Sequence, residues 1–368
     1  MDYRFVSVPA FAVGEDLSHA WDRLCDRIVD ARPESRPAWV GAADRFRPEG
    51  RTQVHAAFAG RDLVAVFPVA TVQSTVHGIP CKVAQGPAQD DSHATDALIR
   101  PDHRTPGLIR AWVRHLEGEV EADLIRFPSL PVRSALREVL PQAGLPYVQR
   151  AVPCARVVDV RSPESLERLS RRKWRDLDRL RRRAVRDHGP LRCRSFERPE
   201  PVLAGLDLFL TLEASGWKGE WDTLSALAHR RGDRLFYETV MTGLAARGAA
   251  RVDVLYAGTR PVSGQLAVRG GGTWHLLRIG YDETFRRIGP GGLLLRSFLE
   301  EVAADPSIEA VHLGTAPDWS DRWHMDEVGV VDLQIFRPTR RGRLLLAAAR
   351  AEDRIGTAPG QGGPRLAS

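Results

Sequence analysis

Hydrophobic positions along the chain follow two different periods. Between residues 17 and 31, Leu17, Trp21, Leu24 and Ile28 lie three or four positions apart, which indicates the apolar face of a helix. The same spacing predicts further helices at residues 37–46, 105–117, 134–143, 171–186, 202–215, 235–247, 293–302 and 347–353. Short runs rich in β-branched and other apolar residues predict strands at residues 1–10, 53–58, 63–69, 122–127, 153–160, 251–257, 262–269, 273–281, 309–313 and 330–336.

The order of these elements, helices followed by a hairpin, a helix and a strand, occurs twice along the chain. This repetition predicts an α/β (α+β) fold with two tandem lobes, each a mixed sheet flanked by helices. We place an N-terminal lobe at residues 1–155 and a C-terminal lobe at residues 156–340. Residues 341–368 are expected to form a helix and a disordered tail, because the end of the chain is rich in glycine and proline. Residues 83–87 and 90–92 are expected to lie in a loop-rich region.

Composition narrows the class of protein. The chain has 368 residues, 43% of them hydrophobic, which is enough for a substantial core. Its net charge of +6 comes mostly from arginine, since Lys82, Lys173 and Lys218 are the only lysines. The four cysteines form no Cys-x-x-Cys pair, so we expect neither a zinc site nor a disulfide framework, and we expect a reducing cytoplasm. The N-terminus does not resemble a signal peptide, and no apolar run reaches the length of a membrane helix.

A glycine-rich turn follows the predicted strand at residues 273–281 and precedes an apolar helix. Such a turn presents unpaired backbone N–H groups, and the dipole of the following helix adds partial positive charge, so the turn suits a phosphate or pyrophosphate. The alternative is a plain loop that caps a helix. The expected cofactor-binding residues are Arg286, Arg287, Ile288, Gly289, Gly291, Gly292 and Leu293. The turn is not a Walker loop, because no Gly-Lys-Ser/Thr follows, and its glycine order is not that of a Rossmann fingerprint.

The spacing Arg286-x-x-Gly289-x-Gly291 fits the Arg/Gln-x-x-Gly-x-Gly/Ala pattern of the GNAT acyltransferases. Residues 171–334 resemble the CelD/BcsL (cellulose-biosynthesis-type, BioF-like acetyltransferase) branch of that superfamily. The motifs that carry the resemblance are Arg171-Arg-Lys-Trp-Arg, Phe209-Leu-x-Leu-Glu-Ala-Ser-Gly-Trp-Lys-Gly219, Tyr281-Asp-x-x-Phe285, Gly289-Pro-Gly291 and Val311-His-Leu-Gly314. The resemblance implies tandem GNAT-like lobes and an N-acyltransferase that holds acyl-CoA (acetyl-CoA) as co-substrate at the glycine turn. The N-terminal lobe has no Gly-x-Gly phosphate loop after its hairpin, so we expect one coenzyme site, in the C-terminal lobe, with the N-terminal lobe shaping the acceptor cleft.

Acyl transfer to an amine requires a held thioester, a neutral amine and a stabilised oxyanion. Glu213 is a candidate base or amine-binding acid, with a solvated helix residue as the alternative. Tyr281 is a candidate donor to the departing thiolate or a buried aromatic anchor. Asp282 either orients the amine or caps the turn. His312 is a second candidate base, although a histidine in a strand is more often a structural group, and His275 is a further candidate.

Three more residues are expected to contact the acceptor, namely Trp217 and Lys218 after the helix at 202–215 and Trp319 in an aromatic loop. None of the candidates has metal-ligand spacing, so we expect no metal. Cys193 lies between two arginines, whose charge would lower the pKa of its thiol, but we expect it to line a strand rather than to react.

The predicted helix Arg171–Arg186 contains nine basic and two acidic residues. It is either a solvated face in an arginine-rich protein, a surface for tRNA or another nucleic acid, or a contact for a ligand anion. Our leading hypothesis is a cytoplasmic N-acyltransferase that acylates the amine of a small molecule, sugar or amino acid derivative. One alternative is an aminoacyltransferase of the Fem type, which takes its donor from tRNA. Another is a non-catalytic accessory protein of polysaccharide biosynthesis.

Overall fold

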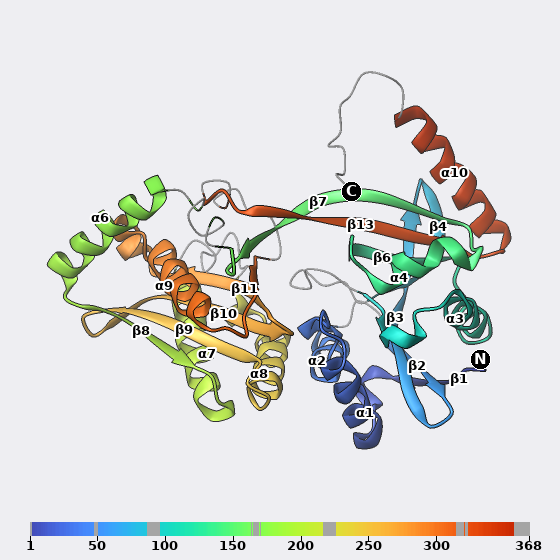
Figure 1. Ribbon diagram of the computed structural model, residues 1–368, viewed down its shortest axis with the longest axis horizontal. Coiled ribbons are helices and arrows are strands. Elements are labelled where there is room, and N and C mark those ends of the chain that lie inside the picture. Colours follow the sequence, from blue (N-terminus) through green and yellow to red (C-terminus); the bar gives the residue numbers. More distant parts are fainter. Residues whose placement is uncertain are drawn as a thin grey trace.

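The computed structural model describes residues 2–47, 51–86, 96–162, 164, 169, 171–215, 226–313, 320 and 323–356. In this part of the chain thirteen strands form one mixed sheet, with helices on both of its faces (Figure 1). The strands are β1 (Arg4–Pro9), β2 (Thr52–Ala59), β3 (Asp62–Val76), β4 (Ile79–Gln85), β5 (Leu98–Ile99), β6 (Leu124–Pro131), β7 (Tyr147–Asp159), β8 (Leu191–Phe196), β9 (Ala250–Ala257), β10 (Arg260–Gly270), β11 (Thr273–Tyr281), β12 (Ala310–His312) and β13 (Asp326–Phe336). The α-helices are α1 (Glu15–Asp26), α2 (Pro37–Phe46), α3 (Pro106–Glu119), α4 (Ala135–Val139), α6 (Arg171–His188), α7 (Pro199–Ala214), α8 (Arg231–Ala245), α9 (Pro290–Ala304) and α10 (Arg340–Gly356).

The N-terminal lobe (β1 to β6) and the C-terminal lobe (α6 to β12) repeat one order of elements. After an edge strand and two helices, each lobe has three antiparallel strands, a helix and a strand that is parallel to the third. The parallel pair is β4 with β6 in the N-terminal lobe and β11 with β12 in the C-terminal lobe, and each pair spans three residues. The predicted fold, a mixed α/β architecture with a large sheet between helices, is therefore confirmed.

The strand that follows each lobe pairs with the other lobe. β7 comes after the N-terminal lobe and pairs with β12, whereas β13 comes after the C-terminal lobe and pairs with β6. β7 and β13 also pair with each other and run together between the two lobes (Figure 1). The predicted domain boundary at residues 155 and 156 falls inside β7, so the division of the chain at that point stays a prediction.

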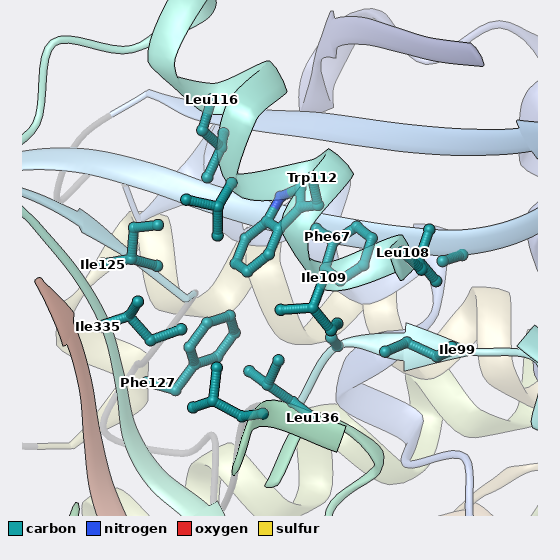
Figure 2. Close-up of a cluster of buried hydrophobic side chains, with 14 of the residues drawn as sticks. Phe67, Ile99, Leu108, Ile109, Trp112, Leu116, Ile125, Phe127, Leu136 and Ile335 are labelled. Carbon is teal, nitrogen blue, oxygen red and sulfur yellow. The ribbon is translucent and has the colours of Figure 1, made fainter. Parts of the chain in front are cut away.

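Each lobe has its own hydrophobic core. In the N-terminal lobe, Phe67 and Trp112 stack with their ring centroids 4.4 Å apart, and Phe127 lies beside them (Figure 2). Ile335 of β13 packs into the same cluster, so the exchanged strand helps to fill the core of the other lobe. In the C-terminal lobe, α6 and α9 cover one face of the sheet and α7 and α8 cover the other. The two faces of β11 therefore meet different helices.

The loop after α1, in the N-terminal lobe, packs against the C-terminal lobe. The predicted helix at residues 17–31 ends at Asp26, and the following turn reaches the glycine turn between β10 and β11. A Cβ atom on Gly271 would lie 2.0 Å from the carbonyl oxygen of Val29, and one on Gly270 would lie 2.5 Å from that of Ala31. Only residues without a side chain allow this approach, and Gly271 also has a φ of 57°.

Several predicted elements differ from the structure. β4 occupies part of the region that we expected to be loops, because its short run of Ile79, Cys81 and Val83 is interrupted by proline and lysine. β3 extends to Val76, well beyond the predicted end at residue 69, since its second part alternates between exposed and partly buried side chains. The predicted tail at residues 357–368 lies outside the described residues. No helix among the described residues has both the length and the apolar character that crossing a membrane requires.

Candidate active site

β11 and β12 form a fork in the sheet. They pair only where Thr273–His275 lie beside Ala310–His312, after which β11 continues to Tyr281 and β12 ends. Within the described residues, β10 is the one strand that pairs with residues 276–281, so no described strand covers the other edge of this segment. The register against β10 also shifts at Leu277, which is the extra residue of a β-bulge.

Beyond the bulge, alternate residues of β11 face different helices. A Cβ atom on Gly291, at the start of α9, would lie 3.5 Å from Ile279 and 3.7 Å from Tyr281. On the other face, Gly280 approaches Glu213 of α7, where an added Cβ would lie 3.1 Å from the Cβ of Glu213. Tyr281 and Glu213, which we both predicted to be catalytic, therefore lie on opposite faces of the sheet near the end of β11.

The predicted coenzyme loop adopts a tight turn. Residues Glu283–Ile288 form a 3₁₀ helix, Gly289 has a left-handed φ of 61°, and Pro290 is the first residue of α9. Glycine is favoured at this φ because it has no Cβ atom. As the N-cap residue of α9, Gly289 has no side chain that could accept a hydrogen bond from the first turn. In the N-terminal lobe the equivalent helix α3 is capped, because the hydroxyl of Thr105 accepts from the Leu108 backbone N–H at 3.3 Å.

Side chains of this loop point in different directions. Arg286 and Arg287 are exposed, whereas Ile288 and Leu293 are buried in the core beneath α6 and α9. An anion at this turn would therefore meet the two guanidinium groups and the backbone N–H groups of the first helical turn, and not the side chains of Ile288 or Leu293.

Two of the glycines also allow α6 to pack closely. A Cβ atom on Gly289 would lie 3.0 Å from Leu180, and one on Gly292 would lie 3.1 Å from Leu177. We attributed these glycines to the approach of an anion, and the structure adds helix packing as a second reason for them. Gly291 is different, because it faces Ile279 and Tyr281 of β11.

Tyr281 and Asp282 close the strand and open the turn. Burial, followed by the charge of Glu283, raises the pKa of Tyr281. The carboxylate of Asp282 accepts from the Thr284 backbone N–H at 2.9 Å and from its hydroxyl at 2.6 Å, which caps the 3₁₀ helix. The turn-capping role that we considered for Asp282 is therefore present, whereas its contact with an amine stays a prediction.

Glu213 is fully buried in α7, so the solvated alternative for this residue is wrong. Its carboxylate accepts a hydrogen bond from the Leu227 backbone N–H at 3.0 Å. The other carboxylate oxygen lies 3.8 Å from Nη1 of Arg278, on the face of β11 that carries Gly280. Glu213 thus holds Arg278 and the segment around Leu227 in place.

His275 and His312 are partners in the parallel register of β11 and β12, so their side chains project from the same face. Their ring centroids are 5.3 Å apart with an interplanar angle of 36°, and both side chains are almost completely buried. The pair occupies the last paired position before the two strands diverge. We named His312 as a candidate base and His275 only as a weaker one, because nothing in the sequence indicates that they are neighbours.

Both histidines line a cavity of about 620 Å³ between the two lobes. Its walls come from the loop after α1, from the segments around β5 and after β6, and from β11, β12 and β13. The charged and histidine residues that line it are Asp30, Arg32, Asp96, Arg104, Arg133, His275, Glu309, His312 and Glu327. The sequence did not indicate which residues line this cavity, because its walls come from distant parts of the chain.

The remaining predictions concern the acceptor residues, the Cys193 thiol and a metal site. Trp217, Lys218 and Trp319 lie outside the described residues, so their contact with an acceptor stays a prediction. Cys193 lies exposed in β8, yet loss of hydration and then the charge of Asp253 raise the pKa of its thiol to about 12, which is opposite to the lowering that we expected from the adjacent arginines. Within the described ranges, no three His, Cys, Asp or Glu residues are grouped so that they could hold a metal ion.

The basic helix α6 presents most of its arginines to solvent. Leu177 and Ala184 face the core, while the side chains of Arg179 and Arg186 are each 73% exposed. Arg186 is paired with Asp187 at 2.8 Å. The helix therefore combines a packed apolar stripe with a basic outer face, as its sequence predicted.

Comparison with solved structures shows the same fold at low sequence identity. FemX superimposes with a TM-score of 0.63 at 10% identity, over 94% of this chain and 100% of that chain. A conserved protein of unknown function from Bacteroides thetaiotaomicron gives 0.54 at 10% identity, over 87% and 97% of the two chains. L-PGS from Bacillus licheniformis gives 0.52 at 14% identity, over 85% and 91%. No curated protein matches the sequence significantly.

Residues 154–323 match the family described as acetyltransferase (GNAT) domain. The matched segment contains the β9 to β11 strands, the glycine turn, α9 and the fork between β11 and β12. The GNAT part of the resemblance is thus confirmed, while membership of the CelD/BcsL branch stays a prediction. Residues 154–323 are therefore similar to a GNAT acetyltransferase domain.

Proposed function

We propose that this protein is an N-acyltransferase that transfers an acyl group from acyl-CoA to the amine of a small molecule, such as a sugar or amino acid derivative. The observation that carries the proposal is the junction of β11 with α9. There the segment 276–281, which diverges from β12, ends beside a helix N-terminus whose N-cap residue is glycine. The edge of a diverging strand suits the amides of a pantetheine arm, and a helix N-terminus suits a pyrophosphate.

In this proposal the pyrophosphate binds at the start of α9. The side chains of Arg286 and Arg287 and the backbone N–H groups of the first turn contact it, because these are the groups that the turn exposes. The seven residues of this subsite are Arg286, Arg287, Ile288, Gly289, Gly291, Gly292 and Leu293. Ile288 and Leu293 support the turn from the core.

The thioester lies in the fork, where a backbone N–H of β11 stabilises the oxyanion. A C–N bond forms, the C–S bond breaks, and His312, with His275 beside it, takes the proton from the amine. The histidine pair passes this proton to the departing thiolate, because Tyr281 lies six residues beyond His275 on β11, about 20 Å away, where it lines the path of the donor. Glu213 acts through Arg278 as a positioning residue, and Asp282 holds the turn.

The identity of the acyl donor, the family branch, the cellular location and the acceptor contacts are also proposals. Acetyl-CoA is our preferred donor, and the CelD/BcsL branch and a cytoplasmic location are the preferred context. We further propose that Trp217, Lys218 and Trp319 contact the acceptor, as their position in the sequence predicted.

Isothermal titration with acetyl-CoA and octanoyl-CoA tests the coenzyme site. In the Gly291→Glu variant, a carboxylate near the start of α9 is favourable to the helix dipole but repels a pyrophosphate. Gly107→Glu is a matched control, because Gly107 follows the first proline of α3 as Gly291 follows that of α9. We expect micromolar binding in the native protein and in Gly107→Glu, and binding at least about tenfold weaker in Gly291→Glu. No binding of either acyl-CoA to the native protein would overturn the proposal.

The second candidate function is aminoacyl transfer from tRNA. The exposed basic face of α6 favours it, since guanidinium groups bind phosphates and α6 packs against the start of α9. Fluorescence anisotropy with an aminoacyl-tRNA, at salt concentrations between 50 and 200 mM, tests this function. If it is correct, binding weakens steeply with salt and is lost in the double variant Arg181→Glu/Arg182→Glu. If the leading proposal is correct, acetyl-CoA binds and the tRNA does not.

A further inference from the structure

The cavity between the lobes has two chemically different walls. On the C-terminal side, His275 and His312 project from β11 and β12, with Glu309 near the start of β12. On the N-terminal side, Arg32 and Arg104 approach from the loop after α1 and from the residues before α3. At about 620 Å³, the cavity lies within the size range of small-molecule sites.

The arginine wall contains donors that lack acceptors. Nη1 of Arg32 and Nε of Arg104 are both buried, and neither makes a hydrogen bond within the described structure. The carboxylates nearest to Arg104, those of Asp30 and Glu138, are each 3.7 Å away, which is longer than a charge-assisted hydrogen bond. A buried guanidinium N–H without an acceptor is unfavourable, and an anion that entered the cavity would relieve this cost.

Four carboxylates line the cavity, and that of Asp30 is paired with Arg104 of the same wall at 3.7 Å. Glu327 forms an ion pair with Arg156 at 2.5 Å. Asp96 accepts from the hydroxyl of Ser134 at 2.8 Å, and burial raises the pKa of its carboxyl group to about 7, so part of its charge is lost near neutral pH. On the N-terminal wall, Arg32, Arg104 and Arg133 outnumber Asp30 and the partly protonated Asp96, so the net charge of this wall is positive.

We propose that this cavity holds the acceptor, and that the acceptor is a small amine that also carries an anionic group, either a carboxylate or a phosphate. The amine lies against His275 and His312, at the apex of the fork where the thioester arrives, and the anionic group binds Arg32 and Arg104. This orientation separates the two ends of the acceptor and places the nucleophilic nitrogen beside the proton acceptor. The inference rests on the proposed acyltransferase function and names the substrate class of the same site.

Two pairs of amines, which differ only in the anionic group, provide the test. β-Alanine is compared with n-propylamine, and O-phosphoethanolamine with ethanolamine, in a coupled assay of CoA release from acetyl-CoA. We expect kcat/KM to be at least about tenfold higher for one anionic amine than for its neutral partner. The preferred member of the two anionic amines distinguishes a carboxylate site from a phosphate site. Equal kcat/KM values within both pairs would overturn the inference.

Variants of Arg32 and Arg104 test whether these two residues cause the preference for an anionic amine. Arg32→Gln and Arg104→Gln should each lower kcat/KM for the preferred anionic amine about tenfold and leave that of its neutral partner unchanged. Arg61→Gln, on the exposed turn between β2 and β3, is a control that should change neither value. Thermal melting and titration with acetyl-CoA verify that each variant is folded and retains its donor site. An equal loss for both amines would contradict the inference.

Titration calorimetry distinguishes failure of this inference from failure of the proposed function. Binding of O-phosphoethanolamine and of β-alanine, each compared with its neutral partner, is measured without any acyl-CoA. If acetyl-CoA binds and is turned over but the amines show no preference, the acyltransferase proposal stands and the acceptor class is wrong. If acetyl-CoA does not bind but an anionic amine binds in an Arg32-dependent manner, the cavity is an anion site and the reaction is wrong.

Discussion

His275 and His312 face each other from neighbouring strands, with their ring centroids 5.3 Å apart at the point where β11 and β12 diverge. This pair links the two parts of the candidate site. On one side is the fork that leads to the start of α9, and on the other is the cavity between the lobes. A proton acceptor at this position is adjacent to both proposed substrates.

His312→Asn tests the role of the pair in catalysis. We expect kcat to fall by about 10² to 10⁴, because general-base assistance is worth that much, while the affinity for acetyl-CoA is unchanged. The measurements are kcat at saturating substrates and titration with acetyl-CoA. His229→Gln, an exposed histidine outside the site, is the control. A His312→Asn enzyme with native kcat and a native pH profile would exclude His312 as the base.

Glu213→Gln distinguishes a positioning role from a catalytic one. The amide can still accept from the Leu227 N–H but loses its charge toward Arg278. We expect the free energy of unfolding to fall by about 2 kcal/mol, the order expected for a buried charged contact. Urea denaturation gives this value. If stability is native and kcat falls at least a hundredfold, the carboxylate participates directly in the reaction and our assignment is wrong.

We expect burial of His55 to make the free energy of unfolding depend on pH in the acidic range. The side chain is fully buried in the N-terminal lobe, and burial, then the charge of His115, lowers its pKa to about 4. Between pH 4 and the ordinary histidine value of about 6.5, the unfolded chain binds more protons than the folded one, so stability rises with pH through this window. His55 should make the protein about 2 kcal/mol less stable at pH 5 than at pH 7.5.

Urea denaturation at these two pH values measures the effect. In the His55→Gln variant the difference between pH 5 and pH 7.5 should shrink by that amount, whatever the absolute stability of the variant. The control His229→Gln should keep the native pH dependence. An unchanged difference in His55→Gln would show that His55 is not the group responsible.

Gly271→Ala tests the contact between the lobes. A Cβ atom at this position would lie 2.0 Å from the Val29 carbonyl oxygen, so the two lobes must move apart to accommodate it. Gly248→Ala is the matched control, because Gly248 has a similar left-handed φ of 65° but no atom near the added Cβ. The control should cost about 1 kcal/mol for the backbone conformation, and Gly271→Ala about 2 kcal/mol more. Equal losses in thermal denaturation would show that the contact is not constrained.

The local elements of the fold could be predicted from the sequence because hydrophobic spacing reports which residues face a core. The helix Pro37–Phe46 and the strand Thr273–Tyr281 have the predicted limits, and the strand, glycine turn and helix at residues 273–304 were expected in that order. The pattern was less informative for β4, whose few apolar residues are interrupted by proline and lysine. It also did not indicate where α1 ends, because Ile28 continues the helical spacing beyond Asp26.

By itself, the sequence therefore determined the class of fold, the repeated order of elements and the position of the glycine turn, since each depends on neighbours along the chain. Tertiary structure decided the features that depend on strand register and lobe contact. Parallel pairing of β11 with β12 placed His275 beside His312, and the exchange of β7 and β13 joined the two lobes. The cavity with Arg32 and Arg104 exists only because segments far apart in sequence meet across that joint, and hydrophobic spacing carries no information about such contacts.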